Sequence, residues 1–594
     1  MRLLSALLLL VSALVVAGAT SAKPIHDAGP DADARFAALA QRWLDGSLRL
    51  SPVSATQTGD HRFDSELDDL SADGFAKSVA FSHEILDELD KIDRTALSRD
   101  NQVDAAILQN QLRYDIWSYD KLQGRFWDPQ IYGQLAGNAI YVLMARDFAP
   151  MPDRLRAATA RIEKIPALFA QMHDNLVLAR VPLIHAQTVA KQNKGLLSLV
   201  DELITPHIGE LPEADRKRLE AAVANLRKAV DEQQVWLDKT LVPNAKGDFR
   251  LGKELYDAKL AFALNSPLTR EEISRRATAE MTRARAEMYA VARGVLARKD
   301  GAPPTPENPS PEQQQAAIQA ALEIAYAERP ARDQVVPSSK AALAAATEFV
   351  RKHDLITLPD SPVDVILMPE FQRGVTVAYC DSPGPLDKKL STFFAVSPIP
   401  DDWTAEQTTS FLREYNTRSI DELTVHEAMP GHYVQIWHSN QNPSILRAVL
   451  SSGSFVEGWA VYSEKMMVDE GFLDHDPLYK LINLKWYLRV IANSLIDQGI
   501  QVDGMTREQA MEIMTKQAFQ EEREAAGKWV RAQLTQAQLP TYFVGVQEQM
   551  DLRAEAERRE GAKFDLKKYH DTVLSFGSPP ARYVHELMFD ESIR

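Results

Sequence analysis

The spacing of apolar residues predicts that the first half of the chain is helical. Between about Asp31 and Lys299, apolar residues recur three and four positions apart with charged residues between them, as in the segment DRLRAATARIEKIPALFAQMHDNLVLARV. This period places the apolar side chains on one face of a helix. We therefore expect a set of antiparallel helices, followed by a loop at 301–312, where the segment GAPPTPENPSPE holds five prolines.

The pattern changes after a further helical stretch that ends near His353. Three short segments are rich in β-branched or aromatic residues and are bounded by Gly, Pro and Asp: SPVDVILM at 361–368, GVTVAYC at 374–380 and STFFAVS at 391–397. Such segments are typical of strands. After Trp403 the helical spacing returns and continues to the end. The order predicts a mainly α fold with a small β-sheet. With 594 residues, the chain is too long for one ordinary core, so we expect two helical lobes.

The first 22 residues, MRLLSALLLLVSALVVAGATSA, resemble a secretory signal peptide. Arg2 gives a positive start, residues 3–17 are an apolar run, and small residues allow cleavage after Ala19 or Ala22. The alternative is a membrane anchor, but the run is short for a spanning helix. We therefore predict a protein that is exported to the periplasm or secreted. We expect no stable membrane insertion after the signal is removed.

Composition excludes some partners. The formal net charge is −16, which disfavours nucleic acid because phosphate binding requires a basic face. Cys380 is the one cysteine, so the chain cannot form an internal disulfide. We expect it to be a buried or neutral thiol rather than a nucleophile.

A candidate metal motif lies in the segment TVHEAMPGH, which ends at His432. Ser419 and Glu422 fit a capping box that starts its helix. Zinc peptidases carry His-Glu on a helix with a second His four residues on, and the Glu is the general base. Here the second His is six residues after His426. At about 100° per residue the two rings lie about 120° apart on a regular helix, so one ion cannot bind both.

The Pro-Gly pair before His432 offers a way around this problem. Pro430 has no N–H with which to continue the helix, and Gly431 tolerates unusual dihedral angles. We therefore predict a break or bulge that brings His432 back beside His426. His-Glu also occurs at 83–84 and 585–586, but only the pair at 426–427 has a second His within six residues. His438 competes with His432 as the second ligand.

A third ligand is expected from the segment SFVEGWAVYSE at 454–464. Glu457 on a second helix could complete the site and leave a fourth position for water. The competing interpretation is that Glu457 closes a capping box with Ser454. Glu464 lies two turns further along the same face and is a reserve candidate.

HEAMPGH followed by EGWAVYSE resembles the bacterial family called domain of unknown function 885, whose members resemble zincin-type metallopeptidases. Tyr433 departs from the family, which usually has a His at this position. Other segments extend the resemblance over most of the mature chain: LGKELY at 251–256, LTREE at 268–272, DQGI at 497–500, TREQA at 506–510, PTY at 540–542, FDLKKYH at 564–570 and GSPP at 577–580.

The pattern along the chain divides the mature protein into an N-terminal helical region at 23–300, the proline-rich loop at 301–312 and a region at 313–594 that carries the candidate metal motif. The resemblance implies that this last region is the catalytic region of a gluzincin-like zinc peptidase. It favours Glu457 over Glu464, so the implied Zn²⁺ ligands are His426, His432 and Glu457. Glu427 is the implied general base, and Tyr542 is the implied donor to the oxyanion. His570 either orients the substrate or is an ordinary polar His.

The expected substrates are short or unfolded peptides that enter a cleft between the helical lobes. An extended peptide could pair with the strand at 374–380 or the strand at 391–397. Two alternatives stay open: a zinc hydrolase of non-peptide amides or esters, and a helical binding protein with a degenerate site. Glu427 argues against the second alternative, because a structural zinc site needs no base.

Overall fold

The computed structural model describes residues 30–593 except 298, 370–372 and 374–376. The predicted signal segment at 1–22 lies outside the described residues, as does part of the predicted strand at 374–380. Among the described helices, none is long and apolar enough to cross a membrane. The chain is mainly helical with one small sheet, as the sequence predicts.

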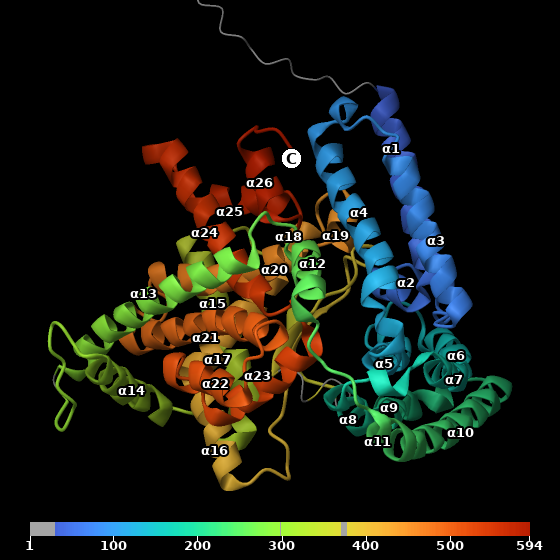
Figure 1. Cartoon of the computed structure of the whole chain (residues 1–594), viewed down its shortest axis with the longest axis horizontal. Coiled ribbons are helices and arrows are strands. Elements are labelled where there is room, and N and C mark those ends of the chain that lie inside the picture. The colour runs from blue at the N-terminus through green and yellow to red at the C-terminus, as the bar shows by residue number, and fades with distance from the viewer. Residues whose placement is uncertain (1–29, 298, 370–372, 374–376, 594) are drawn as a thin grey trace, which may run out of the picture.

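Two groups of helices precede residue 250, and each has its own apolar core (Figure 1). The first group consists of α1 (Pro30–Leu50), α2 (Pro52–Thr58), α3 (Ala72–Leu89) and α4 (Arg99–Trp117). The second group consists of α5 (Gln130–Met144), α6 (Met151–Ile162), α7 (Ile165–Asn175), α8 (Leu183–Gln192), α9 (Gly195–Leu199), α10 (Glu213–Trp236) and α11 (Val242–Asn244).

The remaining helices lie mostly around the largest core, which also takes in the sheet, but the helices at 507–535 pack on a smaller core and the helix at 445–449 packs on the core of the first group. They are α12 (Gly252–Leu264), α13 (Arg270–Leu296), α14 (Pro311–Ala327), α15 (Val335–His353), α16 (Ala405–Glu414), α17 (Thr417–Glu427), α18 (His432–Ser439), α19 (Ile445–Val449), α20 (Gly453–Asp469), α21 (Pro477–Gln501), α22 (Arg507–Glu512), α23 (Glu522–Thr535), α24 (Pro540–Glu560), α25 (Leu566–Ser575) and α26 (Ala581–Met588). Helices α12 and α13 therefore join this core although they precede the proline-rich segment.

The sheet contains β1 (Val363–Leu367), β2 (Ala378–Asp381) and β3 (Thr392–Val396) in the order β1-β3-β2. Strand β1 is parallel to β3, and β2 is antiparallel to it. Helix α15 packs against β1 and α17 against β2. Because β3 is paired on both edges, the prediction that a peptide could pair with the strand at 391–397 is wrong. Among the described strands, β1 and β2 are the edges of the sheet, and β2 is the edge strand that packs against α17.

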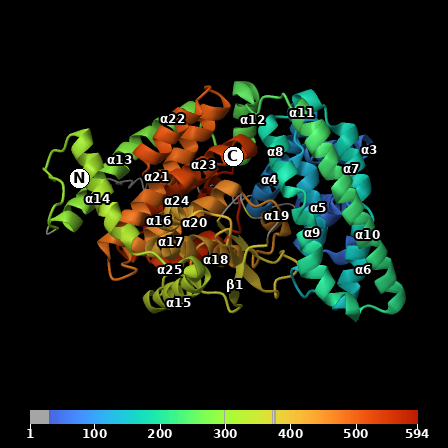
Figure 2. The same ribbon diagram turned by 90° about the horizontal axis from the view of Figure 1, so that it is seen from below.

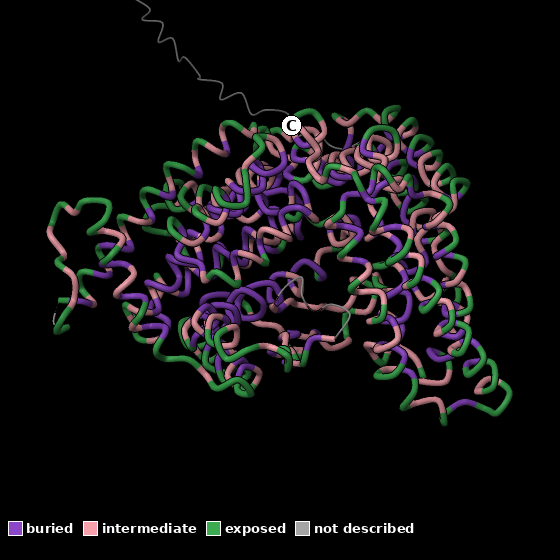
Figure 3. Tube along the Cα trace, turned by 60° about the horizontal axis from the view of Figure 1, so that its bottom comes forward, coloured by how far each residue is buried: buried purple, intermediate pink, exposed green. Residues whose placement is uncertain are grey.

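The helices before residue 250 and those after it lie on opposite sides of the molecule, seen from two directions in Figures 1 and 2. Buried segments run through both sides, and exposed segments follow the rim (Figure 3). A buried arginine joins the sides: Arg447 of α19 is 1% exposed and pairs with Asp104 of α4 at 2.6 Å. Because removing one member of a buried pair is costly, this contact fixes α19 against α4.

Helices α20 and α24 approach each other closely at two glycines. A Cβ on Gly458 would lie 2.3 Å from the carbonyl carbon of Gly545, and a Cβ on Gly545 would lie 1.9 Å from the oxygen of Ser454. Both contacts are with backbone, so no side chain can move aside to relieve them. The glycines therefore set the position of the first turns of α20.

Gly545→Ala should lower the free energy of unfolding by about 1–3 kcal/mol, since it overpacks a helix contact. Gly527→Ala is the matched control, because Gly527 lies within α23 and a Cβ there would meet nothing within 4 Å. The control should gain about 0.5–1 kcal/mol from helix propensity. Urea unfolding measures both, and equal stability of the two variants would contradict the close approach.

Candidate metal centre

The helix that carries His426 ends one residue later, at Glu427, and α18 begins at His432. This confirms the predicted break in the helix. The N–H of Gly431 donates to the oxygen of Val425 at 2.9 Å. A Cβ on Gly431 would lie 1.9 Å from the oxygen of His426. The chain therefore turns back tightly enough that only glycine fits at this position.

The turn brings the two histidine rings together. The ring centroids of His426 and His432 lie 4.8 Å apart, and the ring planes are nearly perpendicular at 85°. Trp459 of α20 holds the turn in place, because its indole N–H donates to the oxygen of Pro430 at 3.0 Å.

Glu457 of α20 faces both rings. Its Oε2 lies 3.6 Å from Nε2 of His426 and 3.5 Å from Nε2 of His432. The three candidate ligand atoms all lie within 4.8 Å of one another. The side chains of the histidines are each 11% exposed and that of Glu457 is 18% exposed, so an ion can reach them. The structure thus brings together the three residues that the sequence proposes as ligands.

The donor set fits zinc in kind, and the separation of Glu457 from each histidine suits a tetrahedral site. Bonds of roughly 2.1 Å in a tetrahedral site place neighbouring ligand atoms about 3.4 Å apart, close to the separations from Glu457 to each histidine. Oε2 of Glu457 is also buried without a hydrogen-bond partner among the described residues. A buried carboxylate oxygen without a partner is costly, and a cation would satisfy it.

The predicted capping box at Ser419 is wrong, and so is the competing interpretation that Ser454 and Glu457 form one. Asn416 caps α17 by accepting a hydrogen bond from the N–H of Ser419, so the helix starts before the predicted Ser419. Ser452 caps α20 by accepting from the N–H of Phe455, so Ser454 is already inside that helix. In both cases a polar residue two or three positions upstream takes the cap. Glu457 is therefore free of the capping role that competed with a role as ligand.

Glu464 lies behind His426 and away from the cluster. Its Oε1 accepts a hydrogen bond from Nδ1 of His426 at 2.6 Å. This contact leaves Nε2 of His426 directed towards Glu457. A carboxylate that orients a ligating imidazole is a common support for metal sites. Glu464 is thus placed to position a ligand and not to serve as one.

A second buried carboxyl supports Glu464. Burial and, to a lesser extent, the charge of the neighbouring Glu464 raise the pKa of Glu422 well above its usual value. Asn483 of α21 donates to Oε1 of Glu422 at 2.6 Å. Buried polar groups therefore continue behind Glu464 towards α21.

Opposite charges stabilise each other within the cluster. Burial acts to lower the pKa of His426, but Glu457 and Glu464 outweigh burial and raise this pKa well above its usual value. Burial acts in the opposite direction on Glu457, whose pKa is nevertheless held well below its usual value by His426 and His432. A metal ion would replace a proton on His426, so binding would release protons.

Two further polar groups lie beside the cluster on the α23–α24 side. The Tyr542 ring lies 6.5 Å from the His426 ring. Arg531 of α23 donates to the Tyr542 hydroxyl at 3.1 Å. The Tyr542 hydroxyl and, more weakly, the Glu457 carboxylate raise the pKa of Arg531. Sequence reasoning missed Arg531, which carries no motif.

Glu427 is the last residue of α17 and is buried. Within the part of the chain that the structure describes, no residue hydrogen-bonds to its carboxylate. Cys380 of β2 lies close enough for the Glu427 charge to act on its thiol, although burial is the main reason why the pKa of Cys380 is raised. Cys380 is therefore a neutral thiol.

Two other histidines point away from the cluster. His438 hydrogen-bonds through Nε2 to the oxygen of Thr357 at 2.8 Å, which removes it as the second ligand. His570 bonds through Nδ1 to the Leu355 oxygen and through Nε2 to the Tyr462 hydroxyl, both at 2.8 Å. Burial lowers the pKa of His570 to about 4. It is a core histidine with both nitrogens satisfied.

The fold and the cluster together define a helical protein with a candidate His-His-Glu metal centre. A family model described as "Bacterial protein of unknown function (DUF885)" matches residues 52–588, and the chain belongs to this family. No curated protein matches the chain.

Two solved structures share the fold. A protein of unknown function from Shewanella oneidensis, described as a candidate lipoprotein, is 33% identical with a TM-score of 0.77. The match covers 93% of this chain and 99% of that one. A candidate lipoprotein from Colwellia psychrerythraea is 17% identical with a TM-score of 0.77, over 94% of this chain and 99% of that one. The second likeness shows the fold alone.

Gly431→Ala should lower the free energy of unfolding by about 1–3 kcal/mol, because its Cβ must push the His426 carbonyl away. Gly453→Ala is the control, since a Cβ at the first residue of α20 would meet nothing within 4 Å. The NMR signals of the His426 and His432 imidazoles should shift in Gly431→Ala and stay in place in Gly453→Ala. Unchanged stability and unchanged signals in Gly431→Ala would mean that the turn is looser than described.

Proposed function

We propose that this protein is a zinc-dependent metallopeptidase that cleaves short or unfolded peptides. The observation that carries the proposal is the convergence of His426, His432 and Glu457 at separations that suit one zinc ion. Three protein ligands leave a position for water and substrate, as catalytic sites require. The buried support from Glu464 favours a site built to hold an ion rigidly.

The surrounding residues supply the acid-base groups. Zinc, when bound, lowers the pKa of a water and polarises a carbonyl. Glu427 adjoins His426 in sequence and has a carboxylate with no described hydrogen-bond partner, so it can accept a proton from water and pass it to the leaving amine. The Tyr542 hydroxyl, polarised by Arg531, can donate to the oxyanion that forms on the substrate.

Strand β2 can hold an extended peptide. It is an edge strand, it adjoins the end of α17 and it carries Cys380 near Glu427. Backbone pairing at a sheet edge orients a peptide without strong selection among side chains. Such pairing requires an unfolded segment, which is why folded proteins are not the expected substrates.

Export to the periplasm or secretion is part of the proposal. It rests on the signal-like pattern at 1–22 and on the description of the two similar structures as candidate lipoproteins.

Glu427→Gln should lower kcat/KM on a short peptide by about 10²–10⁴-fold, because it removes the proton acceptor, while zinc stays at one ion per chain. His432→Ala should lose both zinc and activity, and His438→Ala should keep both because His438 points away from the cluster. Metal analysis and a peptide-cleavage assay on the three variants provide the measurement. Full activity of Glu427→Gln, or full zinc occupancy of His432→Ala, would contradict the assignment.

A further inference from the structure

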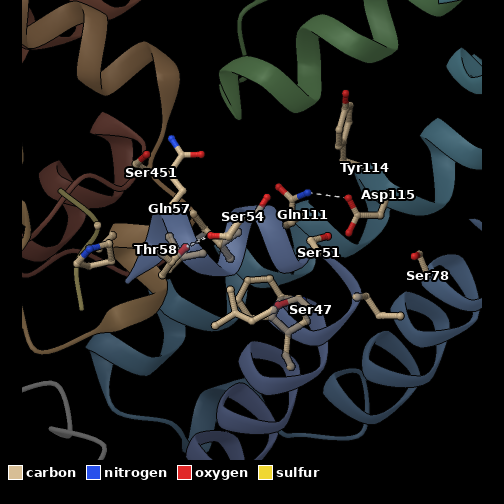
Figure 4. Close-up of a pocket in the computed structure, with 18 of the residues that line it drawn as sticks. Ser47, Ser51, Ser54, Gln57, Thr58, Ser78, Gln111, Tyr114, Asp115 and Ser451 are labelled. Atoms are coloured by element: carbon tan, nitrogen blue, oxygen red, sulfur yellow. Dashed lines mark hydrogen bonds between the residues drawn. The ribbon is translucent and has the colours of Figure 1, made fainter. Parts of the chain in front are cut away.

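A cavity of about 840 Å³ lies between the α1–α4 group and the helices that follow the sheet (Figure 4). Hydroxyl and amide groups dominate its polar lining, among them Ser47, Ser51, Ser54, Gln57, Ser78 and Ser451. Such groups can donate to or accept from a peptide backbone. The cavity is thus suited to a polar ligand.

The cavity reaches the edge strand and the helix that carries Glu457. Cys380 of β2 lines it, and so does Val456, the residue before Glu457 in α20. A peptide held along β2 would therefore extend into the cavity.

Asp115 stands out among the lining residues. It lies near the end of α4, where its carboxylate accepts from the amide of Gln111 at 2.7 Å (Figure 4). It also accepts from the hydroxyl of Ser82 at 3.4 Å. Both partners are neutral, and no cationic side chain within the described ranges pairs with it. Burial raises the pKa of Asp115 to about 6. The cavity therefore holds a half-buried carboxyl group for which the described residues supply no counter-ion.

The other charged groups of the lining are already engaged. Asp381 pairs with Arg146 at 2.8 Å. Arg125 donates to the Tyr119 oxygen at 2.7 Å and lies 3.9 Å from the centre of the Tyr119 ring. Asp115 is thus the lining carboxylate for which the described residues supply no cationic partner.

We propose that Asp115 binds a primary ammonium group of a peptide in this cavity. The proposal rests on the proposed peptidase function and names a substrate class: peptides with a free amine that reaches Asp115. An ammonium offers three donors, which match the carboxylate and the surrounding hydroxyls. Charge-assisted hydrogen bonds of this kind are stronger than neutral ones. The amine can come from a peptide N-terminus or from a lysine side chain.

The test measures peptide binding by calorimetry to full-length, zinc-loaded Glu427→Gln protein, in which bound peptide stays intact. The probes are tetraalanine, N-acetyl-tetraalanine and an N-acetylated tetrapeptide with one lysine. At least one amine-bearing peptide should bind about 10- to 100-fold more tightly than N-acetyl-tetraalanine. Adding Asp115→Asn should abolish that difference. Adding Asp120→Asn should preserve it, since Asp120 is exposed and lies outside the cavity lining.

The pattern among peptides identifies the amine. Preference for tetraalanine assigns the N-terminal group, and preference for the lysine peptide assigns the side chain. Equal affinity for all three peptides, or a preference that survives Asp115→Asn, would overturn the proposal. If Asp115→Asn does not fold, the affinities of the Asp120→Asn protein for the three peptides are compared instead, and equal affinities would overturn the proposal.

Hydrolysis by the chain with Glu427 intact is measured separately. Absence of zinc or of hydrolysis, combined with binding that depends on Asp115, would refute the peptidase proposal alone. Hydrolysis that is equally fast with and without a free amine on the peptide, and that Asp115→Asn leaves unchanged, would refute the ammonium site alone.

Discussion

The structure of the site depends on one backbone constraint. Two histidines six residues apart cannot share a face of a regular helix, so the chain must leave the helix between them. It does so at Pro430 and Gly431, where the backbone passes so close to the His426 carbonyl that a Cβ would not fit. The rest of the cluster is built around this turn. Trp459 bonds to the Pro430 carbonyl, Gly458 lets α24 approach, and Glu457 faces the rings.

The Glu-Gly-Trp segment therefore has a physical reason at each position. Glu457 offers a ligand atom, Gly458 permits the close contact with α24, and Trp459 holds the turn at Pro430. Behind them, Glu464 accepts a hydrogen bond from His426, and Asn483 of α21 holds the neighbouring buried carboxyl of Glu422. The site is thus supported from the α20, α21 and α24 sides at once.

Much of the fold could be predicted from local sequence. Apolar periodicity predicted the helices, and β-branched segments predicted three strands, because both signals arise within a few residues. Strand order could not be predicted in this way, and β3 proved to be central. The capping predictions failed at Ser419 and Ser454, because polar residues just upstream compete equally well in sequence.

The candidate ligands could be predicted because the Pro-Gly break and the paired motifs lie close together in sequence. No local sequence pattern reports contacts between separate helices. Such contacts determine the position of Arg531, the role of Glu464 and the surroundings of the Asp115 carboxylate. The same limit applies to the cavity, whose walls come from segments hundreds of residues apart.

The central claim is that His426, His432 and Glu457 bind one zinc ion. The most direct measurement is a crystal structure of the zinc-loaded protein, with diffraction data collected on both sides of the zinc absorption edge. We expect one anomalous peak within about 2.2 Å of Nε2 of His426, Nε2 of His432 and an oxygen of Glu457. A peak elsewhere, or a zinc-soaked crystal with no peak between these residues, would contradict it.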